Sequence, residues 1–116
     1  MGYELLEKTR IGFHGLPNHT ISISKASVRL SNDMTKYFEH YSHCEVYIDR
    51  ENLRIGLKPS NDMEKGFKIT VAKGKYSEKV YLSVSFLRKG IAFGHYPLTV
   101  DNDGILSFKV KEIAKQ

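Results

Sequence analysis

Two stretches of the chain, residues 21–58 and residues 69–110, carry the same order of apolar and polar positions. Seven positions of the first stretch match seven of the second at a constant offset of 52, so this block aligns without a gap. The matched pairs are Val28/Val80, Leu30/Leu82, Ser31/Ser83, Cys44/Tyr96, Val46/Leu98, Ile48/Val100 and Asp49/Asp101. Because a slip of one residue would turn the apolar face of a strand to water, the shared phase predicts a duplicated structural unit.

The two copies differ in length only where turns are expected. Upstream of the block the offset is 48, which places four additional residues in the turn around 74–77 of the second copy. Downstream the offset is 53, which places one additional residue in the turn 101–104. The pairs that set these offsets are Ile21/Ile69, Ile23/Val71, Lys25/Lys73, Leu53/Leu106, Ile55/Phe108 and Leu57/Val110. Loops tolerate insertions, so these lengths favour duplication over the alternative, a chance resemblance.

Each copy is predicted to fold as two strands, a short helix and a hairpin, because its apolar residues alternate with polar ones along the strands. The expected strands are 21–24, 28–30, 44–48 and 53–57 in the first copy and 67–73, 79–83, 95–100 and 105–110 in the second. Between strands of the first copy, Met34, Tyr37, Phe38 and Tyr41 form an apolar stripe at helical spacing, after candidate caps at 31–33. A short helix or turn is expected at 84–90 of the second copy.

The 116 residues are expected to form a single domain, 1–116, in which a linker at 59–66 joins the copies. An additional strand is expected at 3–13, at a sheet edge, followed by a loop at 14–19. The predicted fold class is mainly β with short helices (α+β), and the predicted architecture is a pseudo-symmetric β-barrel made of the two repeats.

The sequence contains no apolar run of membrane-spanning length, and its first residues lack the basic-then-apolar order of a secretory signal. Cys44 is the single cysteine, so an internal disulfide is excluded, which fits a reducing compartment. We therefore expect a soluble cytoplasmic protein without a membrane partner.

The order of elements resembles a known family. The phrase Ala26-Ser27-Val28-Arg29-Leu30-Ser31, a short helix, and then a hairpin with an acidic turn after Val46-Tyr47-Ile48-Asp49 are similar to the AbrB-type swapped-hairpin unit. The resemblance covers residues 21–110, and two units in one chain resemble the MraZ-like members. It implies two interlocked halves that form one barrel and bind DNA. Ala26 and Glu78 stand where the family has glycine, and Ser31 and Ser83 where it has proline.

The residue types used in catalysis and metal binding do not form a convincing site. His40, His43 and Cys44 lack the fourth ligand of a closed zinc site, and neighbouring His43 and Cys44 would point to opposite faces of a strand. The acidic turn 101–104 enters an apolar strand instead of continuing as a calcium loop, and the glycines form no phosphate-binding loop. We therefore expect no enzyme activity, no metal and no cofactor, and a core position for Cys44.

Positive charge is concentrated in the second copy. Residues 65–89 contain seven Lys and Arg residues against the single acidic residue Glu78, within a chain of formal net charge +5. Basic clusters of this kind are typical of proteins that bind a phosphate backbone, although lysines beside turns are also ordinarily just solvated. The residues expected to contact nucleic acid are Lys25, Arg29, Lys73, Lys75, Lys79, Arg88 and Lys89.

The charge pattern leads to two hypotheses about function. The first is a small non-enzymatic DNA-binding protein, a candidate transcription regulator. Its two basic hairpins, with Lys25 and Arg29 in the first copy and Lys73, Lys75 and Lys79 in the second, would straddle double-stranded DNA while Arg29 or Arg88 reaches a base edge. The alternative is a phage or mobile-element accessory protein that binds another protein by strand addition at the sheet edges 3–13 and 105–110. The sequence leaves self-association into a homo-oligomer open.

Overall fold

The computed structural model of the chain describes Tyr3, residues 18–73 and residues 78–115. In these residues the fold is mainly β, with two short helices, which confirms the predicted class. The elements are β1 (Thr20–Ile23), β2 (Val28–Leu30), the 3-10 helix η1 (Asn32–Phe38), β3 (His43–Asp49), β4 (Arg54–Ser60), β5 (Phe67–Lys73), β6 (Glu78–Leu82), the helix α2 (Ser85–Gly90), β7 (Gly94–Pro97), β8 (Thr99–Val100) and β9 (Leu106–Lys109). The strand predicted at 3–13, the start of the loop that follows it, and the turn 74–77 lie outside the described residues, apart from Tyr3.

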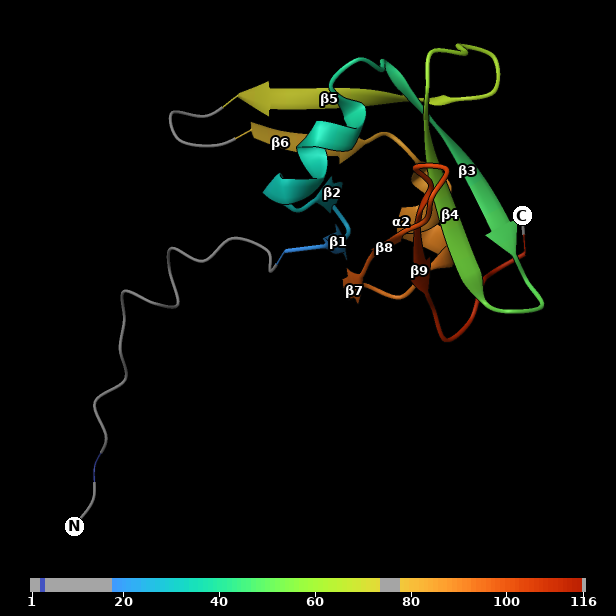
Figure 1. Cartoon of the computed structure of the whole chain (residues 1–116). Coiled ribbons are helices and arrows are strands. Elements are labelled where there is room, and N and C mark those ends of the chain that lie inside the picture. Colours follow the sequence, from blue (N-terminus) through green and yellow to red (C-terminus); the bar gives the residue numbers. More distant parts are fainter. Residues whose placement is uncertain (1–2, 4–17, 74–77, 116) are drawn as a thin grey trace.

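The nine strands form a sheet that curls into a nearly closed, barrel-like shell (Figure 1). Their order is β7-β1-β2-β6-β5-β3-β4-β9-β8, and every pairing is antiparallel. The two outermost strands, β7 and β8, are separated in sequence by Leu98 alone. One short segment of chain therefore supplies both ends of the sheet, which brings those ends together.

Strands of the two sequence copies pair with one another in this sheet. β2 pairs with β6 so that Arg29 lies opposite Tyr81, and β4 pairs with β9 so that Ile55 lies opposite Phe108. In addition, β1 pairs with β7, and β5 pairs with β3. The first hairpin of each copy is thus joined to the second half of the other copy.

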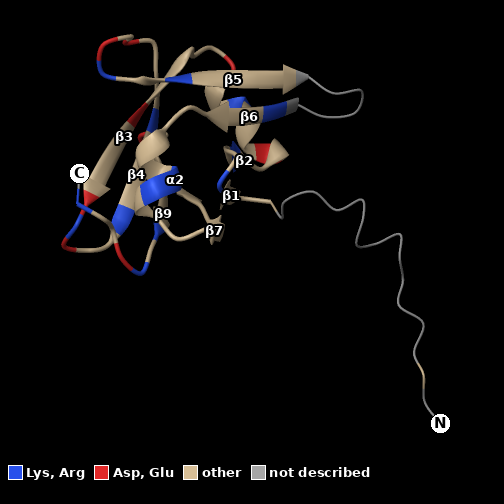
Figure 2. Cartoon of the chain, turned by 180° about the vertical axis from the view of Figure 1, so that it is seen from behind, with Lys and Arg blue, Asp and Glu red and all other residues tan. Residues whose placement is uncertain are grey.

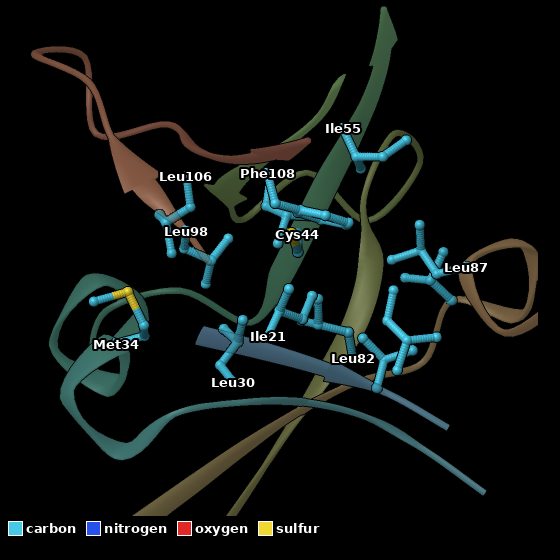
Figure 3. Packing of buried hydrophobic residues seen from close by; sticks show 14 of the residues in the cluster. Ile21, Leu30, Met34, Cys44, Ile55, Leu82, Leu87, Leu98, Leu106 and Phe108 are labelled. Atoms are coloured by element: carbon cyan, nitrogen blue, oxygen red, sulfur yellow. The ribbon is translucent and has the colours of Figure 1, made fainter. Parts of the chain in front are cut away.

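The core lies inside the shell and is built by the alternating residues of the strands (Figure 3). Ile21, Leu30, Cys44, Ile55 and Phe108 are essentially inaccessible to solvent. Their strand neighbours point outward, because side chains alternate across a strand. Such burial removes apolar surface from water, the dominant stabilising term in folding.

The helix η1 contributes to this core, as the apolar stripe predicted. Met34 and Phe38 are buried, and Tyr37 packs against the cluster. The predicted stripe was wrong in its last residue, because η1 ends at Phe38 and Tyr41 is exposed. A 3-10 helix has three residues per turn, so the stripe of an ideal α-helix drifts off its face.

Strand 105–110 differs from expectation, and the segment after it is also held against the rest of the fold. Strand 105–110 was predicted to be a free sheet edge, but β9 pairs with β4 on one side and β8 on the other. The polar tail after it is docked, since the amide of Ala114 donates to the carbonyl oxygen of Gly90 at 3.1 Å. Arg50 also donates to the carbonyl oxygen of Ala114, and Ile113 packs against the core. In the part of the chain described, no helix is long and apolar enough to cross a membrane.

Candidate nucleic-acid interface

A row of polar side chains crosses the outside of five neighbouring strands. The register places His95 opposite Ser22, Ser22 opposite Arg29, Arg29 opposite Tyr81, and Tyr81 opposite Thr70. Directly opposed residues of antiparallel strands share a face of the sheet. The residues before and after Arg29, Val28 and Leu30, are buried, so the row faces outward.

Further cations extend this row along the strands. Lys79 lies two residues from Tyr81 on β6, and Lys68 lies two residues from Thr70 on β5, which puts both on the outer side. Lys25 is exposed in the turn that joins β1 to β2. We call this surface the basic face; it consists of Ser22, Lys25, Arg29, Lys68, Thr70, Lys79, Tyr81, Ser83 and Arg88. Blue segments on β2, β5, β6 and α2 mark several of its cations in Figure 2.

Acidic residues with described side chains belong to other segments of the chain, coloured red in Figure 2. They follow or belong to η1, β3, the loop 61–66, the turn 101–104 and the C-terminal segment, namely Asp33, Glu39, Glu45, Asp49, Glu51, Asp62, Glu64, Asp101, Asp103 and Glu112. The ion pair that the described side chains form joins His19 Nδ1 to Asp33 at 3.1 Å and involves no cation of the basic face. The cations of the basic face therefore keep their charge uncompensated by these carboxylates.

Several of these carboxylates hold turns together. Asp62 accepts hydrogen bonds from the backbone N–H groups of Glu64 and Lys65, at 2.9 and 3.1 Å, and the bonds lower its pKa. Asp49 accepts from the side chain and backbone of Asn52, which lowers the pKa of Asp49. Hydrogen bonds to the charged form favour it. The charged carboxylates of Asp62 and Asp49 therefore act as hydrogen-bond acceptors within their own turns.

Arg88 borders a pocket at one end of the basic face. The pocket has a volume of about 420 Å³ and is lined by Ala26, Ser27, Thr70, Tyr81, Leu82, Ser83, Ser85 and Arg88. The Arg88 guanidinium donates to the carbonyl oxygen of Lys25 at 3.4 Å. This contact ties α2 to the turn between β1 and β2, and so three segments distant in sequence meet at the pocket.

The structure brings together four of the seven predicted contact residues: Lys25, Arg29, Lys79 and Arg88. It separates Lys89 from them, because Lys89 lies beside Ala114 in crevices between α2 and the C-terminal segment. α2 thus directs Arg88 and Lys89 toward different parts of the surface.

The remaining two predicted contact residues fall at the turn 74–77. The backbone of Lys73 pairs with Glu78 at the end of β5, while its side chain and the whole of Lys75 lie outside the described residues.

Sequence reasoning missed Lys68, Thr70, Tyr81 and the pocket serines as members of this surface. The signal for Lys68 and Thr70 was present, because they alternate with Ile69 and Val71 along β5 and so share its outer side. The signal for Ser27 and Ser85 was absent, since only the tertiary fold places them in one pocket. A surface assembled from separate segments cannot be found from strand alternation alone.

In the histidine and cysteine cluster at 40–44, Cys44 and His43 have different surroundings. Cys44 is buried, and burial raises the pKa of its thiol to about 12, so the thiol is protonated at neutral pH. His43 Nδ1 lies 2.6 Å from the hydroxyl oxygen of Ser42 instead. No group of three or more His, Cys, Asp or Glu side chains in the described ranges is arranged to hold a metal ion.

Comparison with protein-family models, with curated proteins and with solved structures finds no match for this chain. The candidate interface is therefore defined by its own geometry and charge.

Proposed function

We propose that the chain is a small, non-enzymatic DNA-binding protein whose basic face contacts the phosphates of a duplex, in the manner of a transcription regulator. The single observation that carries this proposal is the segregation of charge. Arg29, Lys68, Lys79 and Arg88 share one face with hydroxyl groups, while the described carboxylates belong to other segments of the chain and form no ion pair with these cations. Phosphate contacts supply most non-specific affinity for DNA, and such contacts come from Lys, Arg, Ser, Thr and Tyr side chains.

The β5–β6 hairpin places Lys68 and Lys79 on the outer side of the sheet. The β5–β6 hairpin extends away from the rest of the sheet (Figure 1), and a two-stranded β-ribbon fits the major groove of B-DNA. We propose that this hairpin enters or borders the groove, with Lys68 and Lys79 on flanking phosphates.

We further infer that the two sequence copies are related by a pseudo-twofold axis, as in an AbrB-type or MraZ-like barrel. Arg29 matches Tyr81, and Ile55 matches Phe108, in the alignment of the copies. Each residue also pairs with its own counterpart, Arg29 with Tyr81 and Ile55 with Phe108, as a twofold axis through the pairs would require. These registers support the inference and the single-domain organisation.

The other two inter-copy pairings depart from this symmetry by two residues. Cys44 pairs with Phe67. In the alignment of the copies Tyr96 corresponds to Cys44 and His19 to Phe67, so exact symmetry would pair Tyr96 with His19. Tyr96 pairs with Ile21 instead. A shift of two residues keeps every side chain on its original face of the sheet. The inward positions of β7 are therefore preserved despite the different register.

The test is a fluorescence-anisotropy titration with random duplex DNA. The variant Arg29→Gln/Lys79→Gln removes two charges from the basic face, and Lys58→Gln/Lys109→Gln removes two exposed charges from β4 and β9 as the matched control. We expect the first variant to weaken binding by about tenfold or more and the control to change it by less than about threefold. Equal losses in both variants, or no binding at low salt, would refute the proposal and favour a protein partner.

A further inference from the structure

We propose that the pocket beside Arg88 is a binding site for one phosphoryl group, either a phosphodiester of the DNA backbone or a phosphate monoester. This inference rests in part on the proposed function, because it assigns one specific contact within the basic face. The pocket is also a site in its own right, since its lining is defined by three separate segments of the fold.

The side chains that line the pocket favour the binding of an oxyanion. Its lining carries five hydroxyl groups, those of Ser27, Thr70, Tyr81, Ser83 and Ser85, together with the guanidinium of Arg88. Each hydroxyl can donate one hydrogen bond, and a guanidinium matches the paired oxygens of a phosphate. Among the described residues no carboxylate lines the pocket, so these residues offer nothing to neutralise a metal cation or an ammonium group.

One hydrogen bond restrains Arg88 in the absence of a ligand. Its side chain is half-buried, and one terminal nitrogen is held by the carbonyl oxygen of Lys25. The guanidinium has five N–H donors in a planar fork, so a single contact leaves the others free to bind. A side chain already ordered loses less conformational entropy when a ligand binds.

The neighbouring cations favour a phosphoryl group over a neutral ligand. Lys25 is exposed in the turn that contacts Arg88, and Arg29 lies directly opposite the pocket residue Tyr81. Clustered positive charge raises the local concentration of anions. The pocket opens onto the basic face, so a phosphate bound there is continuous with a DNA backbone lying along that face.

The experiment compares Arg88→Gln with Lys89→Gln, two single-charge changes at adjacent positions of α2. Lys89 faces the C-terminal segment and does not line the pocket, which makes it the matched control. Two probes are used with each protein. One is inorganic phosphate, followed by thermal melting against sodium chloride of equal ionic strength; the other is duplex DNA with or without 5′-phosphates, followed by anisotropy.

We expect inorganic phosphate to raise the melting temperature of the wild-type protein and of Lys89→Gln, but not of Arg88→Gln. Arg88→Gln should weaken duplex binding about tenfold, against less than about threefold for Lys89→Gln. A loss on both duplexes assigns the pocket to an internal phosphodiester, and a loss only on the 5′-phosphorylated duplex assigns it to a terminal monoester. Arg88→Lys, which keeps the charge but not the fork, should recover part of the affinity if the pocket holds a phosphate.

Two outcomes separate this inference from the proposed function. If the wild-type protein binds duplex DNA but Arg88→Gln and Lys89→Gln behave alike with both probes, the pocket is not a phosphate site while the DNA-binding proposal stands. If no duplex is bound but phosphate stabilises the wild-type protein and not Arg88→Gln, the DNA-binding proposal fails and the phosphate site stands. Unchanged melting of Arg88→Gln without phosphate shows that the variant is folded.

Discussion

Arg29 and Tyr81 lie directly opposite each other where β2 pairs with β6, and both side chains are on the outside of the sheet. The pair stands at the centre of the basic face, with Ser22 on one side and Thr70 on the other. The same pair joins the two sequence copies. The structural junction of the copies and the proposed DNA interface therefore coincide.

The Tyr81 hydroxyl is expected to bind phosphate, since Tyr81 lines the pocket beside Arg88. Replacing Tyr81 by Phe removes one hydrogen bond, whose net value is about 1 kcal/mol, and so should weaken duplex binding by roughly fivefold. Tyr47→Phe is the control, because Tyr47 is an exposed tyrosine on β3, away from the basic face. Anisotropy titrations that give the same affinity for both variants would contradict this role for Tyr81.

Phe108 is expected to be a major source of stability. Its side chain is fully buried and its ring centroid lies 5.4 Å from that of Tyr96. Phe108→Ala should lower the free energy of unfolding by about 3–5 kcal/mol, through lost burial and the cavity left behind. Phe93→Ala should have little effect, because Phe93 is 59% exposed. Urea denaturation followed by circular dichroism measures both, and a small loss for Phe108→Ala would place this residue outside the core.

Burial of the Cys44 thiol should lower the free energy of unfolding at alkaline pH. Burial raises the pKa of its thiol from 9.0 to about 12 in the folded protein. The folded state therefore retains the thiol proton at pH values where the unfolded state has lost it, and the thiol's contribution to stability, full below pH 9.0, falls as the pH rises toward about 12. Cys44→Ala should show a shallower decline of unfolding free energy over this interval, measured by denaturant titration. Equal slopes would contradict burial of the thiol.

Protonation of the Asp62 carboxylate should lower the free energy of unfolding at acid pH. Backbone N–H groups of Lys65 and Glu64 lower its pKa from the ordinary value of 3.8, so its contribution is present above that value and is lost as the pH falls through the lowered pKa. Asp62→Asn should melt at a lower temperature than wild type at pH 7, with the difference shrinking as both are acidified. Thermal melting across this range tests the point, and a constant difference would mean that the hydrogen bonds do not depend on the charge.

Much of the fold follows from local patterns in the sequence. Alternation of apolar residues located the strands around Ile21 and Ile23 and around Val28 and Leu30, since a half-buried strand must alternate. The alternation does not give the registers of the hairpins, which the structure shows with Ile21 opposite Leu30 in β1–β2 and Ile69 opposite Leu82 in β5–β6.

The parts that sequence patterns could not supply depend on tertiary contacts. The alternation of residues in a strand does not show how many neighbouring strands it has, so it cannot reveal that β9 pairs on both sides. Docking of the C-terminal segment depends on Arg50, which is far from Ala114 in sequence. The pocket likewise requires the turn between β1 and β2 to meet α2, a contact seen between Arg88 and Lys25.

Amide NMR of the labelled protein during titration with duplex DNA tests most directly whether the basic face is the DNA-binding surface. We expect the largest shift changes at Arg29, Lys68, Thr70, Lys79 and Tyr81, and we expect them to diminish when salt is added. Signals from Tyr47, Gly56 and Ser107, which lie side by side on β3, β4 and β9, should remain in place. Changes concentrated on those three strands, or no changes at low salt, would contradict the account.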